Sequence, residues 1–444
     1  MNLRAALCVI AASFVLQNSV PTTTRITWRD VAPLQKRLEA RGITEATFSS
    51  YVDRVGQDNT RRVREGDLDH LVFYALQSTH FTSRPPIEPA LSAKAFVEGG
   101  HRVPPDVKAR IKDLLAALDS SSSDPRLVYF RALVRSSFPV SSAREAALVA
   151  EYTRAMRFVY DKEFVAQRTG PDAVAELYRT RGLSTDTAVE AGFVVYNGLA
   201  ILKALDPTRQ IKRVLIVGPG LDLAPRTSLL EKGPPESYQP WAVIDALLSL
   251  GLSRPDTLTV VGADINPRVV DHLRRAKEAP PTLTLVSGVA ESASVHRTED
   301  YRQYFASLGR AIGEASDTSS AGGLSGHLSK TVRVRSNVAR ALAAEQLDIV
   351  TSRLTSDPFD LIIATNILPY FDDSELMLAT SNIAAMLAPD GVLMHNEPRP
   401  VLGDLTDAVG LHFDQLRRVT IASVVGGAAP LTDVVMLHRK SEKK

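Results

Sequence analysis

The sequence predicts an α/β protein with a mostly parallel sheet, an antiparallel strand at its C-terminal end and an all-α N-terminal region. Three observations predict this fold class. From residue 211 onward, short runs rich in β-branched residues alternate with helical patterns. The last two runs, 417–427 and 431–440, are joined by a short connection containing Gly and Pro. Before residue 211, helical periodicity predominates and no series of strands is evident.

Length and composition describe an ordinary globular chain. Its 444 residues suffice for two or three domains, and 44% of them are hydrophobic and 23% charged. A formal net charge of +2 gives no basis for a nucleic-acid partner. The single cysteine, Cys8, excludes a disulfide framework. The histidines form no H-x-x-x-H or H-E-x-x-H pair, so we expect no zinc site.

The first nineteen residues differ from the rest of the chain. One basic residue, Arg4, precedes an apolar or small stretch from Ala5 to Leu16, which is too short to cross a bilayer comfortably. This pattern predicts a signal peptide or membrane anchor over 1–19, the only segment for which we expect membrane association. The alternative is a buried N-terminal helix, which would favour a cytoplasmic protein over an exported one.

The helical part of the chain divides into two expected units. Segments 30–42 and 105–120 carry apolar residues at helical spacing, and we expect a helical domain over 20–145. Residues 146–210 continue as helix and are expected to lead into, and lie over, a ligand site. We assign the sheet domain to 211–440.

Five runs are expected to form the parallel part of the sheet, because runs buried on both faces and separated by helices are typical of parallel strands. They are 213–218, 257–264, 282–288, 359–365 and 391–397. The short connection between the last two runs of the chain permits only an antiparallel pair.

Gly218, Pro219 and Gly220 end the first expected strand. Ligands of open α/β sheets bind beyond the carboxyl ends of the strands, near the point where strand order reverses. Glycines there allow the backbone to approach a ligand closely. The alternative is a tight structural turn with no ligand.

The second expected strand ends in Asp264, and Asn266 and Pro267 open a helix; we expect Asp264 and the following Ile265 to contact the cofactor. A carboxylate at this position can accept hydrogen bonds from two ribose hydroxyls. Asp264 could instead cap the helix, but Asn266 is better placed for that role. We therefore favour ribose binding.

The spacing argues against a dinucleotide. Leu223 occupies the third glycine position of a G-x-G-x-x-G fingerprint, and a Pro-rich loop places the next helix near Gln239. A pyrophosphate requires a helix N-terminus close to the glycines. A nucleoside without phosphate, such as S-adenosylmethionine, fits better than NAD.

A third stretch, 358–397, contains the expected strand 359–365, which ends at Asn366, and we expect Asn366 and the following Ile367 to contact the cofactor. Asn366 is expected to face the ligand crevice, where it would contact the methionine part of the cofactor or the substrate. For the following Pro369, Tyr370 and Phe371, simple packing is the better interpretation.

Several segments together resemble the chemotaxis-receptor (CheR-type) methyltransferases, which have a class I Rossmann-like fold and use S-adenosylmethionine. The resemblance covers about residues 180–400 and is carried by "VGADINPRVV", "YRQYF", "TVRVRSNVARAL", "FDLIIATNILPYFDD" and "LAPDGVLMHNE". It implies that Asp264 holds the ribose and that Asn366 lies near the methionine end. It also implies that Ser352 or Arg353 takes the adenine-side position and that Thr187 matches a threonine before the first strand.

The departures from that family concern the substrate. The arginine that follows the family's threonine is missing, and Tyr238 and Gln239 replace a pair of acidic residues. A receptor-glutamate substrate is therefore not implied. The sequence predicts an S-adenosylmethionine-dependent methyltransferase with an unknown acceptor, either a small molecule or a protein. The alternative is a non-catalytic cofactor-binding or scaffold protein; no catalytic residue is assigned, and His395 and Glu397 are only candidates for a base.

Overall fold

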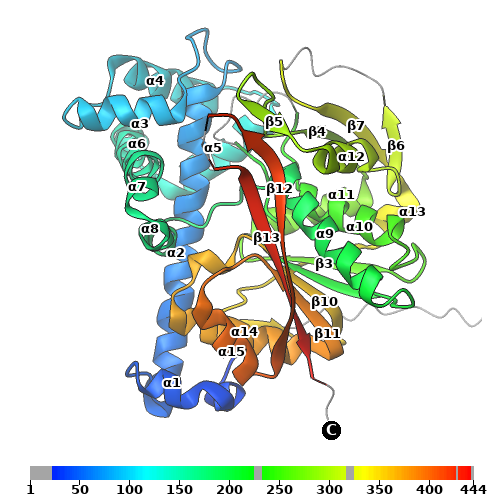
Figure 1. The fold of residues 1–444 in the computed structure, drawn as a ribbon. Coiled ribbons are helices and arrows are strands. Elements are labelled where there is room, and N and C mark those ends of the chain that lie inside the picture. Colours follow the sequence, from blue (N-terminus) through cyan, green and yellow to red (C-terminus); the bar gives the residue numbers. More distant parts are fainter. Residues whose placement is uncertain (1–22, 225–232, 317–324, 427–428, 442–444) are drawn as a thin grey trace, which may run out of the picture.

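The computed structural model describes residues 23–224, 233–316, 325–426 and 429–441. Within them, an eight-stranded sheet forms the centre of the molecule (Figure 1). The strands lie side by side in the order β5 (Val295–Arg297), β12 (Leu411–Val424), β13 (Leu431–Lys440), β11 (Leu387–His395), β10 (Phe359–Ala364), β2 (Arg213–Val217), β3 (Thr259–Asp264) and β8 (Leu342–Gln346).

The sheet is mostly parallel. Strands β8, β3, β2, β10 and β11 run parallel to one another, whereas β13 pairs antiparallel with β11 and with β12. From β2 the chain proceeds to β3 and β8 on one side and then to β10 and β11 on the other. Strand order therefore reverses between β2 and β10, and open α/β sheets bind ligands above the carboxyl ends at such a point.

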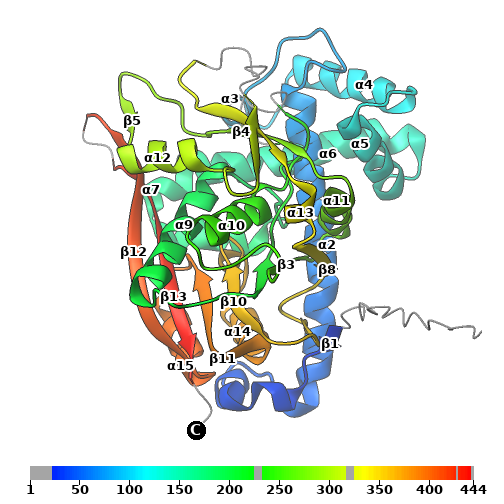
Figure 2. The ribbon, with the colours of Figure 1, turned by 90° about the vertical axis from the view of Figure 1, so that its right-hand side faces the viewer.

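Helices cover both faces of this sheet, which explains why the central strands are apolar throughout. Val214 and Ile216 of β2 belong to one hydrophobic core, with helices α9 (Val189–Leu205), α10 (Tyr238–Ser249) and α11 (Pro267–Glu278). Leu215 and Val217, pointing the other way, belong to a second core with α14 (Asp373–Met386) and α15 (Pro400–Ala408). Figure 2 shows α9 and α10 in front of the sheet.

The prediction of a parallel strand at 282–288 is wrong. Strand β4 (Thr282–Val286) pairs antiparallel with β7 (Ser329–Val334), and β6 (Gly313–Ser316) completes a separate three-stranded sheet. Buried leucines alternate with more exposed threonines in β4, as in a half-buried antiparallel strand. The third parallel strand is instead β8, with the sequence "LAAEQ", where packing between β3 and α11 outweighs weak β-propensity.

Before β2, the described residues hold one short strand, β1 (Thr23–Arg25), which pairs with β9 (Ser352–Leu354); the rest is helix and loop. The expected helix at 105–120 is present as α4, but 30–42 is divided between a 3-10 helix around Pro33 and the short α1. The helices of this region are η1 (Trp28–Leu34), α1 (Gln35–Glu39), α2 (Glu45–Gln77), α3 (Pro89–Glu98), α4 (Pro105–Asp119), α5 (Pro125–Ser137), η2 (Ser141–Ala143), α6 (Arg144–Tyr160), the π-helix η3 (Asp161–Ala166), α7 (Gln167–Thr169) and α8 (Pro171–Thr180). Short helices α12 (Glu299–Ser307), α13 (Ser336–Ala339) and η4 (Leu368–Tyr370) lie within the sheet region.

Helix α2 joins the N-terminal helices to the sheet. Its 33 residues run along the molecule beside the carboxyl edge of the parallel strands (Figure 1). Phe48 and Val52, near its start, belong to the core shared with α14, whereas Leu68 and Leu76 belong to the core shared with α3–α6 and α9. The N-terminal helices are thus packed into the same two cores as the sheet.

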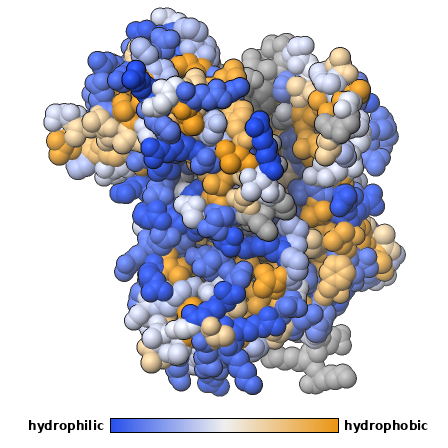
Figure 3. Space-filling view, turned by 60° about the vertical axis from the view of Figure 1, so that its left-hand side comes forward, coloured by the Kyte–Doolittle hydropathy of each residue, from blue (hydrophilic) through white to orange (hydrophobic). Residues whose placement is uncertain are grey.

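Hydrophobic and hydrophilic side chains are interspersed on the face shown in Figure 3. Among the described residues, no helix has both the length and the apolar composition needed to cross a membrane. The expected signal or anchor at 1–19 lies outside the described residues.

Candidate functional site

A cavity of about 880 Å³, counted with the space open to solvent, lies at the carboxyl ends of β2, β3, β8 and β10. It therefore occupies the position where strand order reverses. Its wall comes from four loops that follow these strands, from α2 and α10, and from the segment between α8 and α9. The lining residues are Asn59, Val63, Leu183, Ser184, Thr185, Asp186, Thr187, Ala191, Val217, Gly218, Pro219, Gly220, Gln239, Ala263, Asp264, Ile265, Asn266, Leu347, Asp348, Ile349, Thr365, Asn366, Ile367, Tyr370 and Phe371.

The two glycines after β2 are required by backbone conformation and by close neighbours. Gly218 and Gly220 have φ values of +68° and +72°, a region that residues with a Cβ rarely adopt. A Cβ on Gly218 would stand 2.5 Å from Cγ2 of Ile367, and one on Gly220 would stand 2.6 Å from the carbonyl oxygen of Thr185. The loop thus fits between the segments that contain Ile367 and Thr185, and its two glycines present backbone without side chains to the cavity.

Asp264 presents a buried carboxyl group at the cavity wall. Its Oδ1 accepts a hydrogen bond from the backbone N–H of Asn266 at 2.8 Å, and its Oδ2 accepts one from Gly220 at 3.4 Å. Burial raises the pKa of Asp264 to about 7, although these hydrogen bonds oppose the shift. Asn266 caps α11 by accepting from the N–H of Arg268 at 3.0 Å, so Asp264 is not needed as the cap.

Helix α2 contacts the segment that follows β3 through Asp67. Asp67, 1% exposed, accepts a hydrogen bond from Asn266 Nδ2 at 2.9 Å and another from the Tyr129 hydroxyl at 2.8 Å. Arg268 forms an ion pair with the same carboxylate. A buried charge held by a cation and two donors is well satisfied, and it fixes the side chain of Asn266, whose backbone N–H donates to Asp264.

Residues 181–188, which we call the strap, cross the cavity between α8 and α9. Leu183 to Thr187 all line the cavity. The strap is bonded to the glycine loop, because the N–H of Leu221 donates to the Thr185 carbonyl at 2.7 Å. On its other side, Leu183 donates its N–H to the carbonyl of Arg62 in α2 at 2.8 Å.

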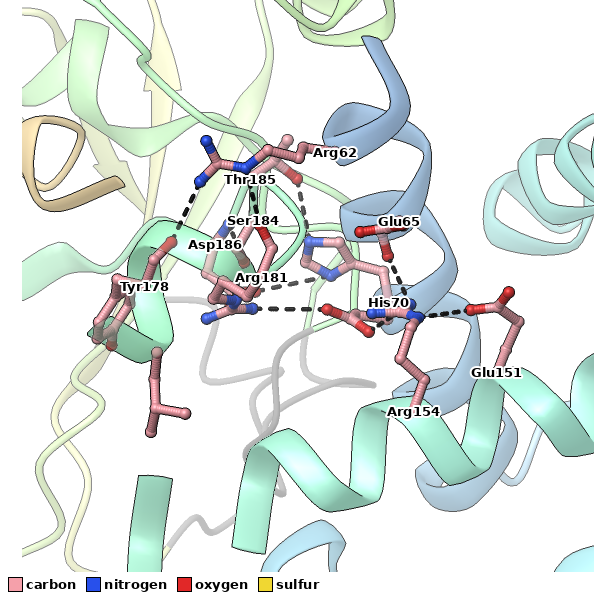
Figure 4. Close-up of polar contacts among 12 residues, drawn as sticks. Arg62, Glu65, His70, Glu151, Arg154, Tyr178, Arg181, Ser184, Thr185 and Asp186 are labelled. Carbon is pink, nitrogen blue, oxygen red and sulfur yellow. Dashed lines mark hydrogen bonds and ion pairs between the residues drawn. The ribbon is translucent and has the colours of Figure 1, made fainter. Parts of the chain in front are cut away.

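Side chains of α2 hold the strap in place (Figure 4). Arg62, 1% exposed, donates to the carbonyl oxygens of Arg181 at 3.0 Å and Tyr178 at 3.1 Å. His70 lies with Nε2 3.1 Å from the Thr185 hydroxyl and Nδ1 3.6 Å from a carboxylate oxygen of Asp186. The strap is therefore an ordered part of the wall.

Amide side chains occupy the side of the cavity next to β10. Gln239 of α10 donates to the Thr365 hydroxyl at 2.7 Å. Asn366, at φ +61°, donates its N–H to Asn396 Oδ1 at 2.8 Å and accepts from Asn396 Nδ2 at 2.7 Å. This reciprocal pair holds Asn366 in a left-handed conformation that asparagine tolerates better than most residues.

On the side next to β8, the two residues expected at the adenine-side position, Ser352 and Arg353, do not line the cavity. Ser352 does not line the cavity; it lies in β9, opposite Arg25, and its hydroxyl donates to the Asp348 carbonyl at 3.0 Å. Arg353 pairs with Asp30 at 2.9 Å, also outside the cavity. The wall here is made by Leu347, Asp348 and Ile349, because the chain turns away before it enters β9.

The cavity wall is acidic. Asp186, Asp264 and Asp348 line it, and none of the lining residues that the structure describes is lysine, arginine or histidine. Such a wall favours a cationic ligand and disfavours a phosphate, because the apolar surroundings strengthen charge interactions.

The start of α10 lies closer to the glycines than the sequence spacing suggested. Gln239, the second residue of α10, lines the same cavity as Gly218. Distance therefore does not exclude a pyrophosphate. Pro240, however, removes one of the free N–H donors in the first turn, and no basic side chain stands nearby in the described wall.

Thus, of the expected cofactor residues, Gly218, Pro219, Gly220, Asp264, Ile265, Asn366, Ile367 and Thr187 line one cavity, and Ser352 does not. Tyr196 of α9 does not line the cavity and packs on Tyr304, with ring centroids 5.5 Å apart. The sequence did not single out Asn59, Asp348 or Asn396. Asp348 and Asn396 each follow a parallel strand, and this position in the sequence could have identified them as candidates. Asn59 lies inside a long helix, where no local sequence pattern marks it as a site residue.

The two candidate bases lie away from the cavity. His395 is 1% exposed and stacks on His438, with ring centroids 5.0 Å apart. Burial lowers the pKa of His395 to about 3. Glu397 forms an ion pair with Arg399, with Oε1 and Nε 3.0 Å apart. Neither residue is placed to take a proton from a ligand in this cavity.

No protein-family model matches the chain, and no curated protein does. Comparison with solved structures finds methyltransferases with low similarity. N-methyltransferase NodS from Bradyrhizobium japonicum WM9 is 14% identical over 56% of this chain and 95% of that chain, with a TM-score of 0.27. The magnesium protoporphyrin IX methyltransferase ChlM from Synechocystis PCC 6803, with bound SAM, is 10% identical over 64% and 94%, with a TM-score of 0.30. A TehB-like SAM-dependent methyltransferase from Corynebacterium glutamicum ATCC 13032 Kitasato is 13% identical over 55% and 88%, with a TM-score of 0.26. These likenesses are too distant to assign an activity.

Proposed function

We propose that the protein is an S-adenosylmethionine-dependent methyltransferase acting on a small molecule or a protein. The observation that carries this proposal is the acidic cavity at the strand-order reversal, with a buried carboxyl group at the tip of β3 and no basic side chain among its described lining residues. S-adenosylmethionine is a nucleoside with a net positive charge at neutral pH. NAD carries two phosphates, which this wall would repel.

The residues present fit the parts of this cofactor. The open backbone of Gly218 and Gly220 provides room for close approach, and Asp264 is placed to accept hydrogen bonds from ribose hydroxyls. Gln239, Thr365 and Asn366 offer hydrogen-bonding groups for a polar amino-acid end. The strap forms part of the cavity wall.

When bound, S-adenosylmethionine supplies an electrophilic methyl group on a sulfonium centre. The contribution of this chain is to hold the reactants in line, which accounts for much of the rate enhancement in such displacements. No general base is assigned. The narrower resemblance to the chemotaxis-receptor methyltransferases is supported by the sequence motifs alone. It does not identify the methyl acceptor.

Calorimetric titration of the full-length protein tests the proposal. We expect S-adenosylmethionine and S-adenosylhomocysteine to bind. We expect NAD not to bind, because the acidic wall repels its phosphates. Tighter binding of NAD than of S-adenosylhomocysteine would overturn the proposal. Transfer of labelled methyl groups to candidate acceptors then separates an enzyme from a non-catalytic cofactor-binding protein.

A further inference from the structure

Asn59 of α2 lies in the cavity wall with half of its amide group unused. The residue is 1% exposed, and its Nδ2 donates to Asp348 Oδ2 at 3.1 Å. Its Oδ1 is buried and has no hydrogen-bond partner among the described residues. A buried amide oxygen without a partner is costly, so such a group at a cavity wall indicates a ligand donor.

The orientation of this amide is fixed by its neighbour. An ionised carboxylate only accepts hydrogen bonds, so the NH₂ group of Asn59 must face Asp348 and the oxygen must face away from it. Asp348 is itself held, because its Oδ1 accepts from the backbone N–H of Val350 at 3.0 Å. Gly56, one turn earlier in α2, packs near Thr351, with its Cβ position 3.8 Å from Cγ2. The helix and the loop after β8 thus present one fixed acceptor.

The position of Asn59 indicates which part of the cofactor it meets. Across the carboxyl edge of the sheet, Asn366 follows β10, Gly218 follows β2, Asp264 ends β3 and Asp348 follows β8. A nucleoside whose ribose lies at Asp264 extends one way toward β10 and the other way toward β8. The β8 side offers apolar surfaces from Val63, Leu347 and Ile349, which suit a planar base.

We propose that Asn59 recognises the 6-amino group of the cofactor's adenine, with Oδ1 accepting a hydrogen bond from that amine. This inference rests on the proposed function and adds the base specificity of the same cavity. It gives α2, an element outside the sheet domain, a direct part in cofactor selection. A hypoxanthine base carries an oxygen in place of the amine and would set two acceptors against each other.

The test compares S-adenosylhomocysteine with S-inosylhomocysteine, in which oxygen replaces the 6-amino group, by calorimetry on the full-length protein. The wild type should bind the adenine form at least about tenfold more tightly, because a buried acceptor without a donor costs this much or more. Asn59→Leu should bind both ligands with nearly equal affinity. Asn59→Ala is a second, smaller change that should give the same result.

Asn382→Leu is the matched control. Asn382 of α14 is also a fully buried amide; its Nδ2 donates to the carbonyls of Ile349 at 2.8 Å and Val350 at 3.2 Å, and its Oδ1 likewise has no partner among the described residues. It holds the same loop but does not line the cavity. Asn382→Leu should keep the wild-type preference for adenine, and thermal unfolding reports the fold of each variant.

The outcomes separate the two proposals. Equal binding of both ligands by the wild type, or a preference that survives in Asn59→Leu and Asn59→Ala, overturns the role of Asn59 and leaves the proposed function standing. A wild-type protein that binds neither ligand overturns the proposed function itself. A preference lost in both Asn59 variants and kept in Asn382→Leu supports the inference.

Discussion

Gly66 in α2 lies directly against the carbonyl group of Leu183 in the strap. A Cβ on Gly66 would stand 1.9 Å from that oxygen, and a Cβ on Gly182 would stand 2.4 Å from the backbone nitrogen of Gly66. The two backbones therefore touch, with no space for a side chain on either one. This contact sets the distance between the long N-terminal helix and the segment that crosses the cavity.

Gly66→Ala should destabilise the protein and weaken cofactor binding. Alanine in a helix interior is normally favoured over glycine by up to about 1 kcal/mol, but here the added methyl group displaces the strap. Overpacking of this kind typically costs about 1–3 kcal/mol, so the free energy of unfolding should fall. Chemical denaturation measures the loss, and calorimetry with S-adenosylhomocysteine measures the affinity.

Gly56→Ala, in the same helix, is the matched control. Its Cβ would meet only Cγ2 of Thr351, at 3.8 Å, which is ordinary contact. This variant should be slightly more stable than the wild type. If both alanine variants were equally stable, the close contact with Leu183 would have no energetic consequence and the prediction would be wrong.

Gly220→Ala tests the glycine loop. The residue has φ +72°, and its Cβ would meet the Thr185 carbonyl at 2.6 Å. Left-handed backbone costs a residue with a Cβ about 1–2 kcal/mol, and the clash adds to this cost. We expect lower stability and at least tenfold weaker binding of S-adenosylhomocysteine, since the loop and the strap must separate.

Gly42→Ala separates strain from contact. Gly42 has φ +78° and no atom within 4 Å of its Cβ position, so alanine there carries only the backbone strain. Its unfolding free energy should fall by less than that of Gly220→Ala, with cofactor affinity unchanged. Equal losses in the two variants would show that the contact with the strap is unimportant.

The ends of the parallel strands were predictable from sequence because they obey local rules. Gly218, Gly220 and Asp264 each follow an apolar run, and the carboxyl ends of parallel strands meet at one edge. The same rule placed Asn366. Strand β8 was missed because "LAAEQ" has little β-propensity, whereas "TLTLV" has more but alternates like a half-buried strand and pairs elsewhere.

The role of α2 could not be predicted in this way. Asn59, Arg62, Asp67 and His70 are buried polar residues on a helix, and their partners lie more than a hundred positions away or, for Tyr129, about sixty. Helical periodicity shows which residues share a face, but it does not show what that face meets. The same holds for Ser352, which lies only four residues after Asp348 but is directed away from the cavity by its pairing with Arg25.

Ser352→Ala should leave cofactor affinity unchanged. The Ser352 hydroxyl donates to the Asp348 carbonyl at 3.0 Å, and the residue does not line the cavity. Loss of this one hydrogen bond should lower the free energy of unfolding by about 1 kcal/mol or less. Calorimetry with S-adenosylhomocysteine checks the prediction, and a tenfold loss of affinity would restore Ser352 to the adenine site.

The pH dependence of cofactor binding should follow Asp264. Burial raises its pKa to about 7 from an ordinary value of 3.8, so in the unliganded protein the carboxyl is largely protonated below about pH 7. The ionised form accepts hydrogen bonds at both oxygens and therefore binds ribose hydroxyls better. Affinity for S-adenosylhomocysteine should rise with pH up to about 7 and level off above it, by at most tenfold per pH unit.

Stability of the unliganded protein should show the opposite trend from this group. The folded pKa exceeds the unfolded one, so the contribution of Asp264 is fully present below about pH 4 and is lost as pH rises through about 7.

Asp264→Asn keeps the size of the side chain and removes its titration. It should bind S-adenosylhomocysteine about tenfold or more weakly at pH 8, with a nearly flat pH profile. A wild-type affinity that falls between pH 6 and pH 8, or a variant that keeps the wild-type profile, would contradict the assignment of Asp264 to the ribose.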